Sequence, residues 1–168
     1  MPWSREELKA AFEHHCALIN KAAQTGDWSK FPGLFTEDAV YIEHSYGTFH
    51  GREEILAWIN NTMTTFPGNQ MTSFPVNWVT YDDEAGRVIC ELDNPMRDPG
   101  DGTQIGATNL TILTYAGDNL WKSQEDVYNP MRFLSATSNA SRRPSVSLVA
   151  SRSWQARVVS TTSDEVSP

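Results

Sequence analysis

The 168-residue chain contains little cysteine and no long apolar run. Cys16 and Cys90 lie far apart and outside any C-x-x-C pair, which disfavours a disulfide framework or a zinc module and favours two buried thiols in a reducing compartment. No stretch approaches the roughly 18 apolar residues of a membrane span, and the N-terminus lacks the basic and apolar regions of a secretory signal. We therefore expect a cytoplasmic protein with no membrane partner.

Basic residues are also scarce in most of the chain. Residues 1–137 hold nine Lys and Arg against nineteen Asp and Glu, a net charge of −10, whereas residues 138–168 hold four Arg against two acids, a net charge of +2. An acidic body argues against nucleic acid as a partner, because phosphate binding uses basic patches. The serine-rich residues 138–168 have too few apolar side chains to offset the entropy of ordering. We predict one domain over residues 1–137 and a disordered Ser/Arg-containing tail over residues 138–168.

Several common catalytic motifs are missing. The sequence has no G-x-S-x-G elbow, P-loop or dinucleotide fingerprint, and its one glycine-rich patch, DPGDGTQIG, is typical of a hairpin turn. Glu43, His44 and His50 could be imagined as metal ligands, but His44 falls on the strand face opposite Glu43. His14 and His15 are neighbours on a helix and cannot bind one metal together, so we place both at the solvent or at the helix edge. We expect neither a metal nor a cofactor.

The hydrophobic periodicity predicts helices first and strands later. Helical patterns cover residues 4–25, where Ser4 and Glu7 form a capping box, and residues 52–65, with a short helical segment between Trp28 and Phe35. Strand-like runs follow at residues 71–81, 87–96, 103–115 and 120–128, separated by turns. Pro75 marks the first of these as an edge strand or the site of a bulge. One helical turn is expected at residues 130–136. This order indicates an antiparallel meander in an α+β domain.

The stretch FTEDAVYIEHSYGTFHGR, residues 35–52, is the first candidate for a functional site. Its alternation places Tyr41 and Glu43 on one strand face and Val40, Ile42 and His44 on the other. A carboxylate and a phenol therefore share one face of the strand.

Two later strands also carry acids. Glu91 and Asp93 share one face, and Asp126 shares a face with Gln124 and Tyr128. If these faces meet the helices, poor hydration and mutual repulsion raise the carboxyl pKa values, as general acids and bases near neutral pH require. A neighbouring tyrosine can position a water or donate to developing negative charge. The alternative is that the acids lie on the solvent face, which strand alternation also produces.

The motifs A-x-x-GDW, LFTEDAVY and G-x-F-x-G-R-E-E-I, followed by strands that end in an acidic one, resemble the nuclear transport factor 2-like (NTF2-like) superfamily. The similarity is greatest to its SnoaL-like branch and covers about residues 5–135. It implies a cone-shaped fold in which a curved antiparallel sheet wraps around about three helices from the N-terminal half. It also implies a homodimer formed through the outer face of the sheet.

Two enzyme branches of this superfamily can be compared residue by residue. The general base of ketosteroid isomerases falls on Glu43, but their two oxyanion-binding groups fall near Ile19 and Thr111. Limonene epoxide hydrolases hold a water with residues that fall on Tyr41, Glu43 and Asp126, although their asparagine is Glu43 here. Their R-x-D motif lines up with Glu91-Leu92-Asp93, so its arginine is also replaced.

We therefore predict a small-molecule enzyme that uses carboxylate general acid/base chemistry on a small, apolar, oxygenated substrate, as an isomerase, cyclase, dehydratase or epoxide hydrolase. Glu43 or Asp126 would be the base, Asp93 the acid and Tyr41 the positioning donor. The candidates for the substrate pocket are the aromatic and methionine side chains Trp58, Phe74, Trp78, Met96, Trp121 and Tyr128. For all of these except Tyr128, dimer contacts and core packing are the alternatives. The alternatives are a non-catalytic ligand-binding or dimerisation module of the same fold, and an interaction domain whose basic tail docks on a partner.

Overall fold

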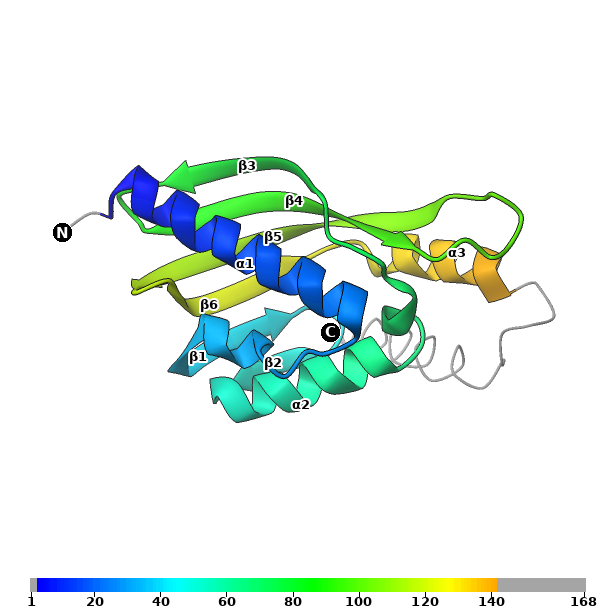
Figure 1. Ribbon diagram of the computed structural model, residues 1–168, viewed down its shortest axis with the longest axis horizontal. Coiled ribbons are helices and arrows are strands. Elements are labelled where there is room, and N and C mark those ends of the chain that lie inside the picture. Colours follow the sequence, from blue (N-terminus) through cyan, green and yellow to red (C-terminus); the bar gives the residue numbers. More distant parts are fainter. Residues whose placement is uncertain (1–2, 142–168) are drawn as a thin grey trace, which may run out of the picture.

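The computed structural model describes residues 3–141, in which a six-stranded sheet is covered on one face by helices (Figure 1). The elements in chain order are α1 (Arg5–Thr25), η1 (Phe31–Leu34), β1 (Phe35–Glu43), β2 (Gly47–His50), α2 (Gly51–Thr64), η2 (Gly68–Gln70), β3 (Val76–Asp82), β4 (Arg87–Met96), β5 (Ile105–Gly117), β6 (Leu120–Val127) and α3 (Pro130–Ser141). The predicted α+β class is confirmed. The tail predicted for residues 138–168 lies outside the described residues from 142 onward.

The strands are ordered β2-β1-β6-β5-β4-β3, and the sheet is not closed into a barrel. All neighbours are antiparallel except β1 and β6, which are parallel and set Glu43 directly beside Asp126. The predicted meander is correct for β3 to β6, but the sheet is mostly rather than wholly antiparallel. β3 is an edge strand, as Pro75 predicted, but it begins at Val76, after the proline, and not at residue 71. Its register shifts between Val76 and Trp78.

Helix α1 begins after the predicted capping residue Ser4 and ends at Gly26. The Ser4 hydroxyl accepts a hydrogen bond from the Glu7 backbone N–H, and Gly26 adopts the left-handed conformation, with φ of 74°, that ends the helix. The buried face of α1 includes His15, which is only 1% exposed, so its predicted place at the solvent or helix edge is wrong. The ring fills a space between aromatic side chains of α1, η1 and β6 and is buried for that reason. His14 is exposed as expected.

The inner face of β4 is the opposite of the predicted one. Its buried positions are Val88, Cys90, Leu92, Asn94 and Met96, and the strand alternates without interruption. The intervening acids, Glu91 and Asp93, therefore lie on the outer face. The prediction that Asp93 reaches inward is wrong, because apolar side chains occupy the other face of this strand and bury it against the helices.

Helix α3 is longer than the single turn predicted at residues 130–136, and it packs on β5. Phe133 is buried and its ring lies 4.8 Å from that of Tyr128. The helix therefore covers the end of the sheet where β6 finishes, close to the inner-face carboxyl groups.

Candidate functional site

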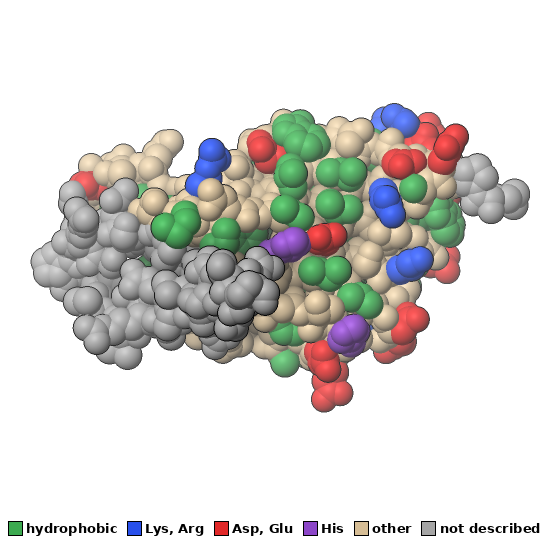
Figure 2. All heavy atoms as spheres, turned by 180° about the vertical axis from the view of Figure 1, so that it is seen from behind, with side chains coloured by type: hydrophobic (Ala, Val, Ile, Leu, Met, Phe, Trp, Pro, Cys, Tyr) green, Lys and Arg blue, Asp and Glu red, His purple; other side chains and the backbone are tan. Residues whose placement is uncertain are grey.

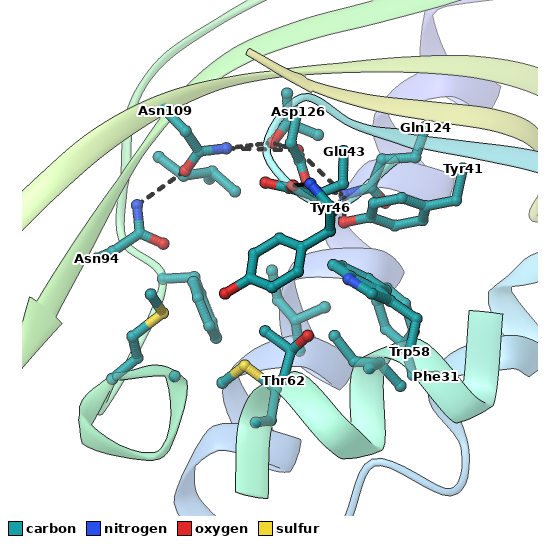
Figure 3. A pocket seen from close by; sticks show the side chains of 18 of the residues that line it. Phe31, Tyr41, Glu43, Tyr46, Trp58, Thr62, Asn94, Asn109, Gln124 and Asp126 are labelled. Carbon is teal, nitrogen blue, oxygen red and sulfur yellow. Dashed lines mark hydrogen bonds between the residues drawn. The ribbon is translucent and has the colours of Figure 1, made fainter. Parts of the chain in front are cut away.

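A pocket lies between the inner face of the sheet and helices α1 and α2 (Figure 3), with a cavity volume of about 130 Å³. A cavity of this order can hold a small organic molecule. Six residues that line it were singled out above in the sequence: Tyr41, Glu43, Trp58, Phe74, Asp126 and Tyr128. Most of the remaining wall is apolar, as the residues Ile19, Trp28, Phe31, Ile59, Met63, Met71, Leu92 and Phe133 show.

Asp126 is the centre of a hydrogen-bond network on the inner face (Figure 3). The Tyr41 hydroxyl donates to its Oδ2, and the Thr111 hydroxyl donates to its Oδ1 over 2.6 Å. The Gln124 amide nitrogen lies 3.3 and 3.2 Å from the two carboxyl oxygens, and that of Asn109 lies 3.4 Å from Oδ1. Both oxygens of Asp126 therefore already accept hydrogen bonds from side-chain donors.

Glu43 lies beside Asp126 on the neighbouring strand and is only 5% exposed. Its Oε2 accepts hydrogen bonds from the backbone N–H groups of Ser45 and Tyr46, at 2.8 and 2.7 Å, in the tight turn that follows β1. The Tyr128 hydroxyl is its side-chain partner. The carboxyl group is thus fixed in direction and has fewer side-chain donors than Asp126.

Burial raises the pKa of both carboxyl groups. Burial and, to a smaller extent, the neighbouring charge of Asp126 raise the pKa of Glu43 to about 7, despite hydrogen bonds that lower it. The pKa of Asp126 is raised by burial against the opposing effect of its donors Thr111, Tyr41 and Gln124. Burial also raises the pKa of Tyr41, so its hydroxyl stays protonated. Two adjacent acids of this kind titrate as a coupled pair.

The helical wall of the pocket carries polar atoms without a hydrogen-bond partner among residues 3–141. They are Nδ1 of His15, the indole nitrogen of Trp58 and the hydroxyl of Thr62. Burial, and then His14, lowers the pKa of His15 to about 3, so its imidazole is neutral near pH 7. The Trp58 ring packs 4.4 Å from the ring of Tyr41. Donors are therefore present on the wall that faces the carboxyl groups.

Three pocket predictions are wrong, in addition to Asp93. Trp78 lies on edge strand β3 opposite the outward Glu91 and is 45% exposed. Trp121 is fully buried in the main core beside Tyr115, where it leaves no surface for a ligand. Met96 lies at the far end of β4, in a separate apolar cluster under α3.

Sequence reasoning missed several polar residues of the pocket. Asn94, Asn109 and Thr111 were not proposed, and Gln124 was noted only as a neighbour of Asp126. Their alternation with apolar residues of β4 and β5 was a usable signal, because Asn94 has the same parity as Leu92 and Asn109 has that of Leu113. His15 was missed although it follows Leu8 and Phe12 at helical spacing.

Metal-binding clusters and membrane-spanning helices are absent from residues 3–141. No group of three or more His, Cys, Asp or Glu in this part of the chain is placed to hold a metal ion. His44 lies on the outer face, where its Nε2 is 2.8 Å from Glu125, as its strand parity predicts. No helix in the described part of the chain is long and apolar enough to span a membrane. Cys16 and Cys90 are free thiols, and burial raises the pKa of Cys16 to about 11.

The fold and the pocket define an α+β protein of the NTF2-like superfamily, with a small-molecule pocket between a curved sheet and its helices. Residues 12–122 match the SnoaL-like domain family. This match covers more than half of the chain, and the protein therefore belongs to that family. No curated protein sequence matches the chain.

Solved structures of other proteins share this fold. A candidate isomerase from Bacillus subtilis is 18% identical, with a TM-score of 0.61 over 79% of this chain and 94% of that one. A protein of ketosteroid isomerase-like fold from Catenulispora acidiphila, solved with trimethylamine, is 20% identical, with a TM-score of 0.59 over 77% and 97%. An LEH-like epoxide hydrolase from M. tuberculosis is 12% identical, with a TM-score of 0.57 over 80% and 92%. At these identities the likeness establishes the fold alone.

Proposed function

We propose that the protein is a small-molecule enzyme that moves a proton with Glu43, as an isomerase of mostly apolar carbonyl compounds. The observation that carries this proposal is a buried carboxyl group with a pKa of about 7 that lines an apolar pocket. Such a group is present in both protonation states near neutral pH, which suits a base that must also return the proton. The chemistry needs neither a metal nor a redox cofactor.

Glu43 is a better proton carrier than Asp126. Both Asp126 oxygens accept bonds from Tyr41, Thr111 and amide groups, and transferring a proton to a ligand would break part of this network. Asp126 instead acts as a positioning group. It holds the Tyr41 hydroxyl, and its charge raises the pKa of Glu43. Asp93, the predicted general acid, faces outward. Reactions that need a second acid on β4 are therefore disfavoured.

The proposed reaction moves one proton within the substrate. Glu43 removes a proton from the carbon beside a carbonyl group, and the electron pair shifts onto the carbonyl oxygen. The same carboxyl group then protonates a different carbon of the extended enolate, which moves the double bond. The unpartnered N–H of Trp58 and hydroxyl of Thr62 are the donors available for the developing oxyanion.

The test is a turnover screen of β,γ-unsaturated ketones, read as the rise in ultraviolet absorbance when the double bond becomes conjugated. We expect kcat/KM to rise with pH through about 7, as Glu43 loses its proton. Glu43→Gln should lower kcat/KM by about a hundredfold or more. The matched control is Glu125→Gln, one residue before Asp126 but on the outer face, which should keep the parent activity. Retention of activity by Glu43→Gln would remove the assigned role.

One observation favours a second candidate, a non-catalytic ligand-binding module. The saturated hydrogen bonds of Asp126 are also what a purely structural polar network requires. This candidate would be supported if the protein bound the screened ketones but turned over none of the compounds tested, whether enones or epoxides.

A further inference from the structure

A chain of hydrogen-bonded side chains crosses the inner face of the sheet from β4 to β1 (Figure 3). Its members, from one end to the other, are Asn94, Asn109, Thr111, Asp126, Tyr41 and Gln124. The chain begins three strands away from Glu43, since β1, β6, β5 and β4 are consecutive in the sheet.

Asp126 accepts every hydrogen bond that it makes in this chain, and this fixes the direction of the bonds that follow. A carboxylate only accepts, so Thr111, Tyr41 and the Gln124 amide all present hydrogens to it. The Asn109 amide nitrogen likewise faces Thr111 at 2.9 Å and Asp126 at 3.4 Å. Its carbonyl oxygen therefore points away from Asp126.

This direction continues to the last member of the chain. The Asn109 oxygen accepts a bond from the Asn94 amide nitrogen at 2.8 Å, and the same nitrogen donates to the Ala107 carbonyl at 2.9 Å. Both hydrogens of the Asn94 amide are thus in use. The amide cannot be turned over, because its oxygen would then face two other oxygens.

The chain consequently ends in an acceptor. Among residues 3–141 the Asn94 side-chain oxygen has no hydrogen-bond partner, and Figure 3 shows it on the pocket side of the amide. A ligand donor in the pocket can therefore bind this oxygen without breaking a hydrogen bond within the protein.

The polar side chains on the inner face of the sheet form the floor of the pocket, which we call the polar floor. Asn94 lies at one end of it and Glu43 at the other. They lie three strands apart in the sheet, on β4 and β1. The pocket wall between the helices and this floor is mostly apolar. The floor therefore fits an elongated ligand with an oxygen function near Glu43 and a hydrogen-bond donor at its far end.

We propose that Asn94 is a specificity residue that accepts a hydrogen bond from a hydroxyl group at the end of the substrate remote from Glu43. This inference rests on the proposed function for the reactive end, and it narrows the substrate to an elongated, hydroxylated carbonyl compound. A methyl ether or a hydrogen at the same place cannot make this bond.

Three biphenyl probes test the subsite by isothermal titration calorimetry. Each carries a hydroxyl group at one end, and the other end carries a hydroxyl, a methoxy group or a hydrogen. The diol should bind the parent about fivefold more tightly than the methoxy compound, since one hydrogen bond contributes about 1 kcal/mol. In Asn94→Leu the three probes should bind alike. Asn77→Leu, an exposed change on β3, is the matched control and should keep the preference.

Equal binding of the three probes by the parent, or failure of the diol to bind, would overturn the proposal even if Asn94→Leu does not fold. A hydroxyl preference that persists in a folded Asn94→Leu protein would also overturn it. The Glu43→Gln variant separates the two proposals, because it should lose turnover and keep the hydroxyl preference. If the parent shows no hydroxyl preference but its turnover still depends on Glu43, the Asn94 proposal fails and the proposed function is kept.

Discussion

Glu43 and Asp126 are register partners on the parallel strands β1 and β6, and both face the pocket. The parallel pairing brings together two carboxyl groups that are 83 residues apart in the chain. Burial disfavours the charge on each, and the proximity of the two disfavours charging both at once. At neutral pH the pair therefore lowers the free energy of unfolding, by an amount that depends on how many protons it carries.

The first prediction concerns the stability of Glu43→Gln. The folded pKa of Glu43, about 7, lies above the ordinary value of 4.5, so the folded protein binds the extra proton between these values. The parent accordingly loses stability as the pH rises from 4.5 to 7, by up to about 3 kcal/mol from this group. Glu43→Gln should be more stable than the parent at pH 8 and nearly equal near pH 5.

Urea unfolding at these two pH values measures the difference. Glutamine can still accept the backbone N–H bonds of Ser45 and Tyr46, so the comparison isolates the charge. Glu125→Gln on the outer face should show no such pH-dependent gain. A Glu43→Gln protein that is less stable than the parent at pH 8 would contradict the buried-charge argument.

The second prediction concerns Asp126→Asn. An asparagine amide would turn donor hydrogens toward Thr111, Tyr41 or Gln124, which already donate to this position. We expect a loss of about 2–3 kcal/mol in the free energy of unfolding, although a buried charge is removed. Asp38→Asn, an exposed change on β1, is the control and should leave stability within about 0.5 kcal/mol of the parent. If Asp126→Asn leaves the free energy of unfolding unchanged, the hydrogen-bond network contributes little to stability.

Period-two alternation predicted much of the site. It placed Tyr41 and Glu43 on one face of β1, and the structure shows both inside. The same rule could not decide the inner face of β4, where the predicted acid Asp93 is outside and Cys90 and Leu92, of the other parity, are the buried positions. Parity fixes which residues share a face but not which face meets the helices.

Long-range pairing could not be read from the chain. The parallel contact of β1 with β6 depends on the crossover through α2 and the later strands, and it decides that Glu43 meets Asp126. On β6 a register shift beside Trp121 interrupts the alternation, so Asp126 faces inward together with Trp121 rather than with Leu120. The burial of His15, by contrast, was visible in its helical spacing from Leu8 and Phe12.

The third prediction concerns the homodimer, which we propose forms through the outer face of the sheet. Apolar side chains gather on this face (Figure 2), and the outward residues of the central strands include Leu110 and Ile112. Ile112→Glu should shift the protein from a dimer toward an 18.8 kDa monomer in sedimentation velocity. The control is Lys9→Glu, at an exposed position of helix α1, and this variant should remain dimeric. A monomeric parent, or a dimeric Ile112→Glu, would rule out this interface.

The last prediction concerns His15, whose pH dependence opposes that of Glu43. Its folded pKa, about 3, lies below the ordinary value of 6.5, so the unfolded chain binds the extra proton between these values. The parent therefore loses stability from this group as the pH falls below 6.5, by about 2 kcal/mol at pH 5. Over the same interval Glu43 makes the folded state more stable, so the two effects should nearly cancel in the parent.

Single variants should uncover the two opposing slopes. In urea unfolding, His15→Leu should gain stability as the pH falls from 6.5 to 5, because only the buried carboxyl groups then respond. Glu43→Gln should lose stability over the same interval. The loss of stability due to His15 remains, and the compensating gain due to Glu43 is absent. His14→Leu, at the exposed neighbouring position, should follow the nearly flat parent curve. If His15→Leu follows the parent curve as well, the imidazole is not held neutral by burial, and the account of this wall of the pocket is wrong.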